Sequence, residues 1–204
     1  MSRPDPTAAP AAAAQSPAGA PAGAGLDQQA DHQHVHHGTG AVPGSRTAPR
    51  VAVVTVSDRS AAGVREDRSG PVAVEALTAL GWSVEALRVV ADGAESVRTA
   101  VADAVAQGVD VVLTLGGTGV GPRDRTPEGT RAVLELELPG VAEVIRARGL
   151  LSTPTAALSR AVAGTAGHSL VVNLPGSPAA VRESLEVLVP LVPQVLEQLR
   201  GGDH

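Results

Sequence analysis

Short runs of aliphatic residues alternate with longer amphipathic stretches from Arg50 almost to the end of the chain. The first run, 51–56, reads Val-Ala-Val-Val-Thr-Val without polar alternation, which is typical of a parallel strand buried on both faces. A second run of this kind covers 110–115. Strands and helices that alternate in this way form an open, mostly parallel sheet with helices on both faces. We therefore predict an α/β fold.

The other elements follow from hydrophobic periodicity and from Gly and Pro stop signals. Further strands are expected at about 83–90, 161–165 and 169–174. Helices are expected at about 71–80, 94–107 and 179–199, with a break or kink at Pro190. Another helix begins at Thr126 and is broken by Pro139-Gly140, and a further helix follows that break. The residues predicted to face inward are Val72, Ala76, Leu77, Leu80, Val97, Val101, Val105, Val141, Val144 and Ile145.

Composition changes sharply near residue 50. Residues 1–49 are mostly Ala, Pro, Gly, Gln and His, and their only larger aliphatic residues are Leu26, Val35 and Val42. Such a segment buries too little apolar surface to offset the entropy that it would lose on ordering. We predict a disordered tail at 1–49 and a single domain at 50–204.

The tail contains a histidine cluster, made up of His32, His34, His36 and His37. Its spacings would let imidazoles share a Zn²⁺ or Ni²⁺ ion. A disordered segment has no preformed metal geometry, so a solvated tail is the favoured interpretation.

Composition also excludes several classes of protein. The chain has no cysteine and therefore no disulfide, thiolate metal site or cysteine nucleophile, which fits a cytoplasmic protein. The net charge is −5, all sixteen basic residues are arginines without a basic run, and Trp82 is the only aromatic residue, so nucleic acid is not expected as a partner. No apolar run approaches the roughly 20 residues that span a bilayer, so no membrane association is expected.

Ligands of open α/β sheets bind at the carboxyl ends of the strands, which here follow Val56, Val90, Leu115 and Leu174. The segment after Leu115 reads Gly-Gly-Thr-Gly-Val-Gly-Pro-Arg-Asp-Arg-Thr-Pro-Glu. Its glycines let backbone N–H groups approach an anion, and the following helix adds a positive dipole end. It is neither a Walker A loop nor a dinucleotide fingerprint. The pattern indicates a phosphate-binding loop, and the alternative is a tight glycine turn.

The other strand ends carry shorter polar segments. Ser57-Asp58-Arg59 is followed by a loop to Ser69 and Gly70, which open a helix and could bind an anion or merely cap that helix. Asp92 is a carboxylate at a strand end, where a single Asp is most often a helix cap. Ser177 lies in a rigid Pro-Gly-Ser-Pro turn that would start a helix or close over a ligand.

Five motifs occur in a fixed order along the chain. They are S-D-x4-G-x3-D-x-S-G-P at 57–71, V-x-D at 90–92, G-G-T-G-x3-R-D-x-T-P-E at 116–128, L-S-R-A-x-A-G at 158–164 and N-L-P-G-S-P at 173–178. Together they resemble the molybdopterin adenylyltransferases, the Mog and MoaB type of molybdenum cofactor biosynthesis protein, over about 50–200. The tail is not covered.

The resemblance implies a three-layer α/β/α domain, commonly a homotrimer, that transfers AMP from Mg-ATP onto the terminal phosphate of molybdopterin, with possible hand-over of the product to a molybdenum insertase. By residue-to-residue matching, Asp92 and Asp124 are the expected catalytic and Mg²⁺-binding residues. The residues expected to bind pterin and nucleotide are Ser57, Asp58, Ser69, Gly117, Thr118, Gly119, Arg123, Thr126, Glu128 and Ser177.

The expected chemistry suits the residues present. A phosphate monoester is already an ionised nucleophile, so its attack on the α-phosphorus of ATP needs positioning and charge neutralisation, not a nucleophilic side chain. Arg59, Arg123 and Arg125 are available to neutralise phosphates, and the resemblance favours Arg123. Two alternatives remain: a non-catalytic MoaB-like protein that only binds molybdopterin, and a nucleotide-processing enzyme like the competence-damage proteins.

Overall fold

The computed structural model describes residues 48–201, which form a six-stranded sheet in the order β2-β1-β3-β6-β5-β4. The strands are β1 Arg50–Val56, β2 Ser83–Val90, β3 Val111–Leu115, β4 Leu136–Glu137, β5 Ala163–Ala166 and β6 Ser169–Leu174. The α-helices are α1 Asp58–Ala61, α2 Ser69–Ala79, α3 Ala94–Ala106, α4 Thr126–Arg131, α5 Pro139–Leu150, α6 Pro178–Leu188 and α7 Val192–Leu199, and two 3₁₀ helices cover η1 Pro154–Leu158 and η2 Val189–Leu191. The predicted tail at 1–49 lies outside the described residues except for its last two positions.

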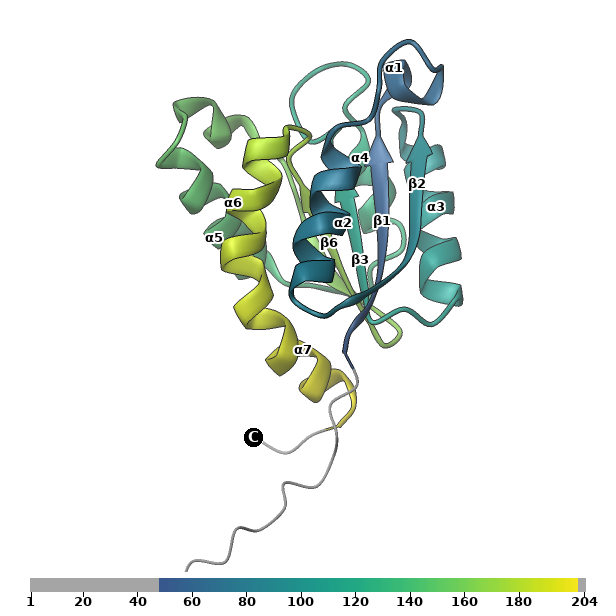
Figure 1. Cartoon of the computed structure of the whole chain (residues 1–204), viewed down its shortest axis with the longest axis vertical. Helices are drawn as coiled ribbons and strands as arrows, with labels where there is room; N and C mark the ends of the chain where they lie inside the picture. Colours follow the sequence, from purple (N-terminus) through teal and green to yellow (C-terminus); the bar gives the residue numbers. More distant parts are fainter. Residues whose placement is uncertain (1–47, 202–204) are drawn as a thin grey trace, which may run out of the picture. The chain divides into compact units, whose positions relative to one another are not determined.

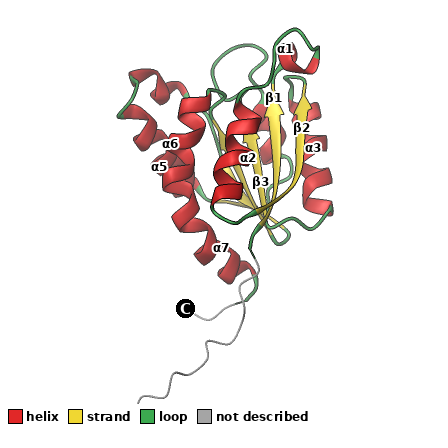
Figure 2. Cartoon of the chain, in the orientation of Figure 1, coloured by secondary structure: helices red, strands yellow, loops and turns green. Residues whose placement is uncertain are grey.

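Four neighbouring strands, β2, β1, β3 and β6, run parallel, whereas β5 and β4 continue the sheet antiparallel. The register pairs Val56 with Val90, Thr55 with Leu115, and Leu115 with Leu174. The carboxyl ends of all four parallel strands therefore lie at one edge of the sheet, as Figure 2 shows for β1, β2 and β3. The prediction of an open, mostly parallel sheet is confirmed.

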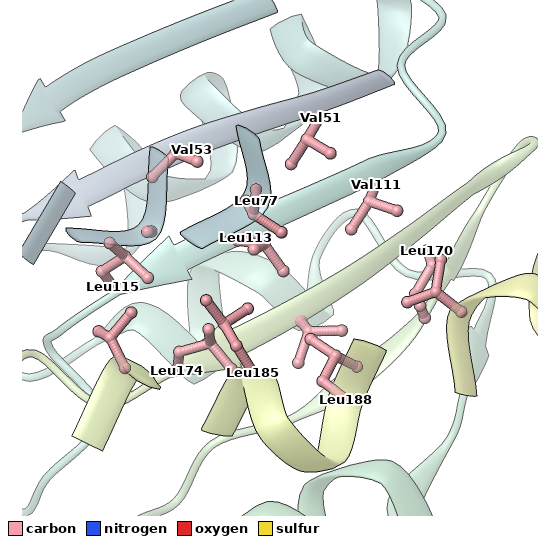
Figure 3. Close-up of a cluster of buried hydrophobic side chains, with 14 of the residues drawn as sticks. Val51, Val53, Leu77, Val111, Leu113, Leu115, Leu170, Leu174, Leu185 and Leu188 are labelled. Atoms are coloured by element: carbon pink, nitrogen blue, oxygen red, sulfur yellow. The ribbon is translucent and has the colours of Figure 1, made fainter. Parts of the chain in front are cut away.

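Alternation along the buried strands divides the core into two clusters, because successive side chains of a strand point to opposite faces. Val51 and Val53 belong to the first cluster, which packs against α2, α5, α6 and α7 (Figure 3). Ala52 and Val54 belong to the second, which packs against α3. In Figure 1, α2 and α6 lie in front of the sheet and α3 behind it. This is the expected three-layer α/β/α arrangement.

The two edges of the sheet differ from its centre. On β2, Leu87 and Val89 are 44% and 38% exposed, since only one neighbouring strand covers this edge. The opposite edge, β4, has only two residues, which is one way that proteins limit strand pairing with other molecules. The helix expected from Thr126 to the Pro139-Gly140 break was wrong in its second half, because α4 ends at Arg131 and the chain forms β4 before Pro139. Neither β4 nor η1 was predicted, because two residues carry no period and a 3₁₀ turn has no apolar face.

Two residues predicted to face inward do not. Leu80 is 55% exposed because α2 has ended at Ala79, and the buried hydrophobic residues of that helix are Ala73 and Leu77. Val144 is 42% exposed, since the buried side of α5 carries Ala142 and Ile145, three residues apart. Trp82 packs against the first core cluster. Within 48–201, no helix combines the length and apolar character that a membrane span requires.

The contrast between Leu77 and Leu80 yields a stability prediction. Leu77→Ala removes a fully buried side chain and should lower the free energy of unfolding by about 2–5 kcal/mol. Leu80→Ala, three residues later, is the matched control and should cost less than about 1 kcal/mol. Urea unfolding followed by circular dichroism measures both. Equal losses would contradict the assignment of these side chains to the inside and outside of the molecule.

Candidate functional site

The loops that follow β1, β2, β3 and β6 enclose a cavity of about 440 Å³ at the carboxyl edge of the sheet. Its walls include Ser57 and Asp58 from the end of β1, Asp92 after β2, and Gly117 and Asp124 from the loop after β3. The register of the sheet brings these segments together, although they are far apart in the sequence. Ser57, Asp58, Ser69, Asp92, Gly117, Arg123 and Asp124 are the predicted site residues that line this cavity.

Two reciprocal hydrogen bonds between Asp58 and Asp92 connect the segments that follow β1 and β2. The backbone N–H of Asp58 donates to Asp92 Oδ2 at 2.8 Å, and the N–H of Asp92 donates to Asp58 Oδ1 at 3.0 Å. Arg123 then joins the glycine-rich loop to this pair, because its guanidinium contacts Asp58 Oδ2 at 2.6 Å and donates to the Asp92 carbonyl at 2.9 Å. One network of hydrogen bonds thus joins three of the predicted site residues, Asp58, Asp92 and Arg123.

The Arg123 guanidinium hydrogen-bonds to Asp58 and lowers the pKa of that carboxyl below its usual range. The same contact raises the pKa of Arg123. Both groups are therefore charged throughout the neutral range. Since Arg123 is already paired with a carboxylate, it is less available to neutralise a phosphate than the sequence suggested.

Three arginines, one on α1 and two on the segment that follows it, supply positive charge at the cavity wall. Arg59, Arg65 and Arg68 line the cavity and are exposed. Within residues 48–201, their guanidinium groups take part in no ion pair or side-chain hydrogen bond. Arg125, in contrast, contacts Glu128 at 3.7 Å and does not line the cavity. The sequence indicated Arg59 but not Arg65 or Arg68, which no regular spacing distinguishes from other loop arginines.

Asp67 has a structural role that the sequence analysis did not assign. Its Oδ1 accepts hydrogen bonds from the N–H groups of Ser69 and Gly70 and from the Ser69 hydroxyl, at 3.0–3.1 Å, and so caps the start of α2. Its Oδ2 accepts from the Thr55 hydroxyl at 2.7 Å. A Cβ on Gly70 would lie 2.3 Å from that Oδ2, so only glycine fits there. The signal in the sequence that could have identified this cap is an aspartate placed two residues before Ser-Gly-Pro.

The glycine-rich loop begins with a sharp bend at Gly116 and Gly117, whose φ angles of +101° and +62° favour glycine. A Cβ on Gly117 would lie 2.3 Å from Thr126 Oγ1 and 3.2 Å from Asp92 Oδ1. Further along, Asp124 Oδ2 accepts a hydrogen bond from the Gly121 N–H at 2.9 Å. The second oxygens, Oδ1 of Asp92 and of Asp124, accept no hydrogen bond from the described part of the chain.

A second cavity, of about 310 Å³, adjoins the first at Gly176, which lines both. Thr118, Gly119 and Ser177 are the predicted site residues in its wall. Its lining also includes the apolar side chains of Ile145 and Leu158. Ser177 caps α6 by accepting from the Ala180 N–H, and Pro178 is the first helical residue, as the sequence predicted.

Thr126 and Glu128 line neither cavity. Both belong to the first turn of α4, beneath the glycine-rich loop. Glu128 contacts Arg160 through Oε1, and this hydrogen bond lowers the pKa of Glu128. Thr126 Oγ1 and Glu128 Oε2 are buried and find no hydrogen-bond partner within residues 48–201. The structure therefore places these two residues behind the site.

The family model described as "Probable molybdopterin binding domain" matches residues 52–194. The chain belongs to this family. A protein of Helicobacter pylori named molybdopterin adenylyltransferase is 38% identical over 158 residues, which cover 74% of this chain and 88% of that protein. The solved structure of the molybdopterin biosynthesis Mog protein from Mycobacterium ulcerans is 47% identical, with a TM-score of 0.71 over 74% of this chain and 99% of its own.

A longer member of the molybdopterin-binding family is also similar. The molybdenum cofactor biosynthesis bifunctional protein of Synechococcus elongatus is 42% identical over 152 residues. The match covers 74% of this chain but only 48% of that protein, so the chain spans about half of its length. These findings confirm the resemblance inferred from the five motifs.

The Arg123–Asp58 contact predicts how Asp58 titrates. Arg123→Gln should raise the pKa of Asp58 toward its ordinary value, because the main stabilising partner of the carboxylate is lost. In the wild type, the stability that this depressed pKa contributes is present above the unfolded value of about 3.9 and is lost as the pH falls through the folded pKa. Carboxyl NMR titration measures the shift.

Arg98→Gln is the control for this titration, since Arg98 pairs with Glu95 at the start of α3. It should leave the Asp58 titration unchanged. An Asp58 pKa that stays low after Arg123→Gln would contradict the assigned cause.

Proposed function

We propose that this chain is a molybdopterin adenylyltransferase, which transfers AMP from Mg-ATP to the terminal phosphate of molybdopterin and releases pyrophosphate. The observation that carries the proposal is that Asp92 and Asp124 line the same cavity as Arg59, Arg65 and Arg68. Carboxylates suited to Mg²⁺ thus lie in one cavity with cations suited to phosphate. The H. pylori relative of the same name supports the assignment.

The two adjoining cavities suit the two parts of each substrate. The larger one is rich in charged side chains and is the proposed position of the phosphate groups. The smaller one has Ile145 and Leu158 in its wall, together with Thr118 and Ser177, and suits a planar heterocycle with polar edges. Gly176 lies between them, where a Cβ would be only 3.1 Å from the Gly116 Cα. Glycine at both positions lets the loops after β3 and β6 approach closely where the two cavities meet.

The proposed reaction joins a terminal phosphate oxygen of molybdopterin to the α-phosphorus of ATP. The new P–O bond forms as the bond from that phosphorus to the oxygen bridging to the β-phosphate breaks, and pyrophosphate leaves with the electron pair. The nucleophile is already ionised near neutral pH, so no side chain has to remove a proton. The task of the protein is to align the two phosphate groups and to offset their charge.

The donor set fits Mg²⁺. The ion typically takes one or two carboxylates and completes its coordination with substrate phosphates and water. Asp92 and Asp124 each have an oxygen without a hydrogen bond from residues 48–201, and they would hold it. No larger group of His, Asp or Glu ligands exists within those residues, so the site depends on substrate oxygens as well. When bound, Mg²⁺ neutralises charge on the phosphoryl oxygens.

The chain's own residues prepare this arrangement. The backbone N–H of Asp58 holds one oxygen of Asp92, and the N–H of Gly121 holds one oxygen of Asp124, so the other oxygen of each carboxylate has no hydrogen bond from residues 48–201. Arg59, Arg65 and Arg68 offset the charge of the incoming phosphates. The rival interpretation is a protein that binds molybdopterin without adenylylating it. The retention of both aspartates favours the enzyme.

The decisive experiment is product analysis after incubation of the protein with molybdopterin and Mg-ATP. The expected products are adenylyl-molybdopterin and pyrophosphate in equal amounts. Tight molybdopterin binding without these products would favour the rival, binding-protein function. ATP hydrolysis that does not depend on molybdopterin would favour a nucleotide-processing enzyme instead.

Asp92→Asn and Asp124→Asn should each reduce AMP transfer by about a hundredfold or more, because the amide keeps the shape but loses the charge. Molybdopterin binding without nucleotide should change little. Asp103→Asn is the matched control, since Asp103 is an exposed carboxylate on α3 that pairs with Arg88, away from the cavity. Single-turnover assays with titrated Mg²⁺ measure the effect. Near-normal transfer by both site variants would refute the two-aspartate mechanism.

A homotrimer, a cytoplasmic location and hand-over of the product to a molybdenum insertase belong to the same proposal. The existence of bifunctional relatives about twice as long as the matched region supports cooperation with a second activity. Light scattering at micromolar concentration should give three times the chain mass of 20.3 kDa. A monomer mass would refute the trimer and leave the proposed reaction open to its own test.

A further inference from the structure

Arg160 joins the segment before β5 to the glycine-rich loop. Its Nε donates to the Gly119 carbonyl at 2.7 Å, its Nη2 donates to the Asp124 carbonyl, and its Nη1 pairs with Glu128 Oε1. Its backbone N–H also donates to the Thr118 carbonyl at 2.8 Å. One residue thus contacts the loop at three carbonyls and the first turn of α4 at a carboxylate.

Arg123 also connects the loop to Asp58, but the backbone of the loop itself is permissive. It begins with two glycines at positive φ, and Gly119 and Gly121 add further backbone freedom. Within residues 48–201, the hydrogen bonds that hold Asp124 in place from inside the loop are those that it exchanges with Gly121. A flexible segment of this kind presents its carboxylate in one position only if something outside it holds the backbone.

Arg160 is itself held in place by the core. The next two residues lead to Val162, whose N–H donates to Asn173 Oδ1 at 3.2 Å and whose carbonyl accepts from the Asn173 N–H at 2.9 Å. The Asn173 side chain is fully buried and also donates to Thr114 of β3 and Thr130 of α4, at 2.8 Å each. The guanidinium is therefore carried by a segment anchored to the centre of the sheet.

From these contacts we infer that Arg160 is a positioning residue for AMP transfer and that Glu128 is its counterion. The planar guanidinium reaches these three acceptors with N–H groups held in a fixed arrangement, which a lysine ammonium does not reproduce. By fixing the Gly119 and Asp124 carbonyls, it fixes the direction of the Asp124 carboxylate in the cavity. Arg160 lines neither cavity, so it acts through the loop rather than on the substrate.

This inference rests on the proposed function, but one of its tests does not need substrate. Arg160→Ala should increase amide hydrogen exchange in peptides covering 117–126 by tenfold or more, while exchange in β3 and α3 stays unchanged. Arg131→Ala is the matched control, because Arg131 lies on α4 and pairs with Glu137 on β4, away from the loop. It should leave exchange in 117–126 unchanged.

Kinetics supply the second readout. Arg160→Ala should lower kcat for AMP transfer by about 10–100-fold, with less than a threefold change in KM for molybdopterin, because a misplaced catalytic group affects the chemical step. Free guanidinium ion should restore part of the lost rate and of the lost exchange protection, whereas sodium at equal ionic strength should not. General destabilisation of the fold would show no such rescue.

Two further variants keep the inference testable if Arg160→Ala folds poorly. Arg160→Lys keeps the positive charge beside Glu128 but loses the planar set of N–H donors. It should change loop exchange and kcat in the same direction as Arg160→Ala, by a smaller factor. Glu128→Gln should speed loop exchange without raising KM for either substrate. A raised KM with unchanged loop exchange would make Glu128 a ligand-binding residue and overturn its assignment as counterion.

The possible results separate this inference from the proposed function. Transfer by the wild type, together with unchanged loop exchange and unchanged kcat in Arg160→Ala, would overturn the role of Arg160 alone. If the wild type makes no adenylyl-molybdopterin, the proposed function fails. Loop exchange and its rescue by guanidinium then decide whether Arg160 positions the loop.

Discussion

One buried amide connects the centre of the sheet to the site. Asn173 on β6 uses both side-chain N–H groups and its carbonyl oxygen, joining β3, α4 and the segment before β5. A buried polar group without partners would cost about 1–3 kcal/mol, so this side chain favours only arrangements in which Thr114, Thr130 and Val162 all reach it. The loop after β3 begins two residues beyond Thr114, and α4 follows that loop. Both ends of the loop are thereby set by the same side chain.

The site needs this support because the loop after β3 is rich in glycine. Glycine permits the bends at Gly116 and Gly117, but it leaves the backbone free to adopt other conformations. Contacts from outside restrict that freedom: Arg123 joins one side of the loop to Asp58 and Asp92, and Arg160 joins the other side to the anchored segment. A permissive backbone and two arginine contacts together give a defined loop that still approaches a ligand closely.

The fold and the general position of the site could be predicted from the sequence, whereas the partners of each charge could not. Buried parallel strands such as 51–56 and 111–115 can be predicted from their nearly unbroken aliphatic runs. Their register then brings Asp92 and Asp124 to the carboxyl edge of the sheet. Helical periodicity failed at Leu80, where the helix had already ended. The sequence could not separate Arg123, which pairs with Asp58, from Arg65, which lines the cavity and pairs with no residue of 48–201, because both are arginines in polar loops.

Some arginines of the site pair with protein groups and others do not, and this difference determines where positive charge is offered to a ligand. The chain has no lysine, so its sixteen strongly basic side chains are all guanidinium groups, each of which presents several N–H donors in a planar fork. Arg123 and Arg160 use that fork on protein acceptors and act as fixed links, while Arg59, Arg65 and Arg68 remain exposed at the cavity wall. If all five were committed to carboxylates, the cavity wall would offer incoming phosphates no arginine free of an ion pair. If all five were free, the loop would lose its anchors. The observed division provides rigidity at the carboxylates and unpaired positive charge where the phosphates are proposed to enter.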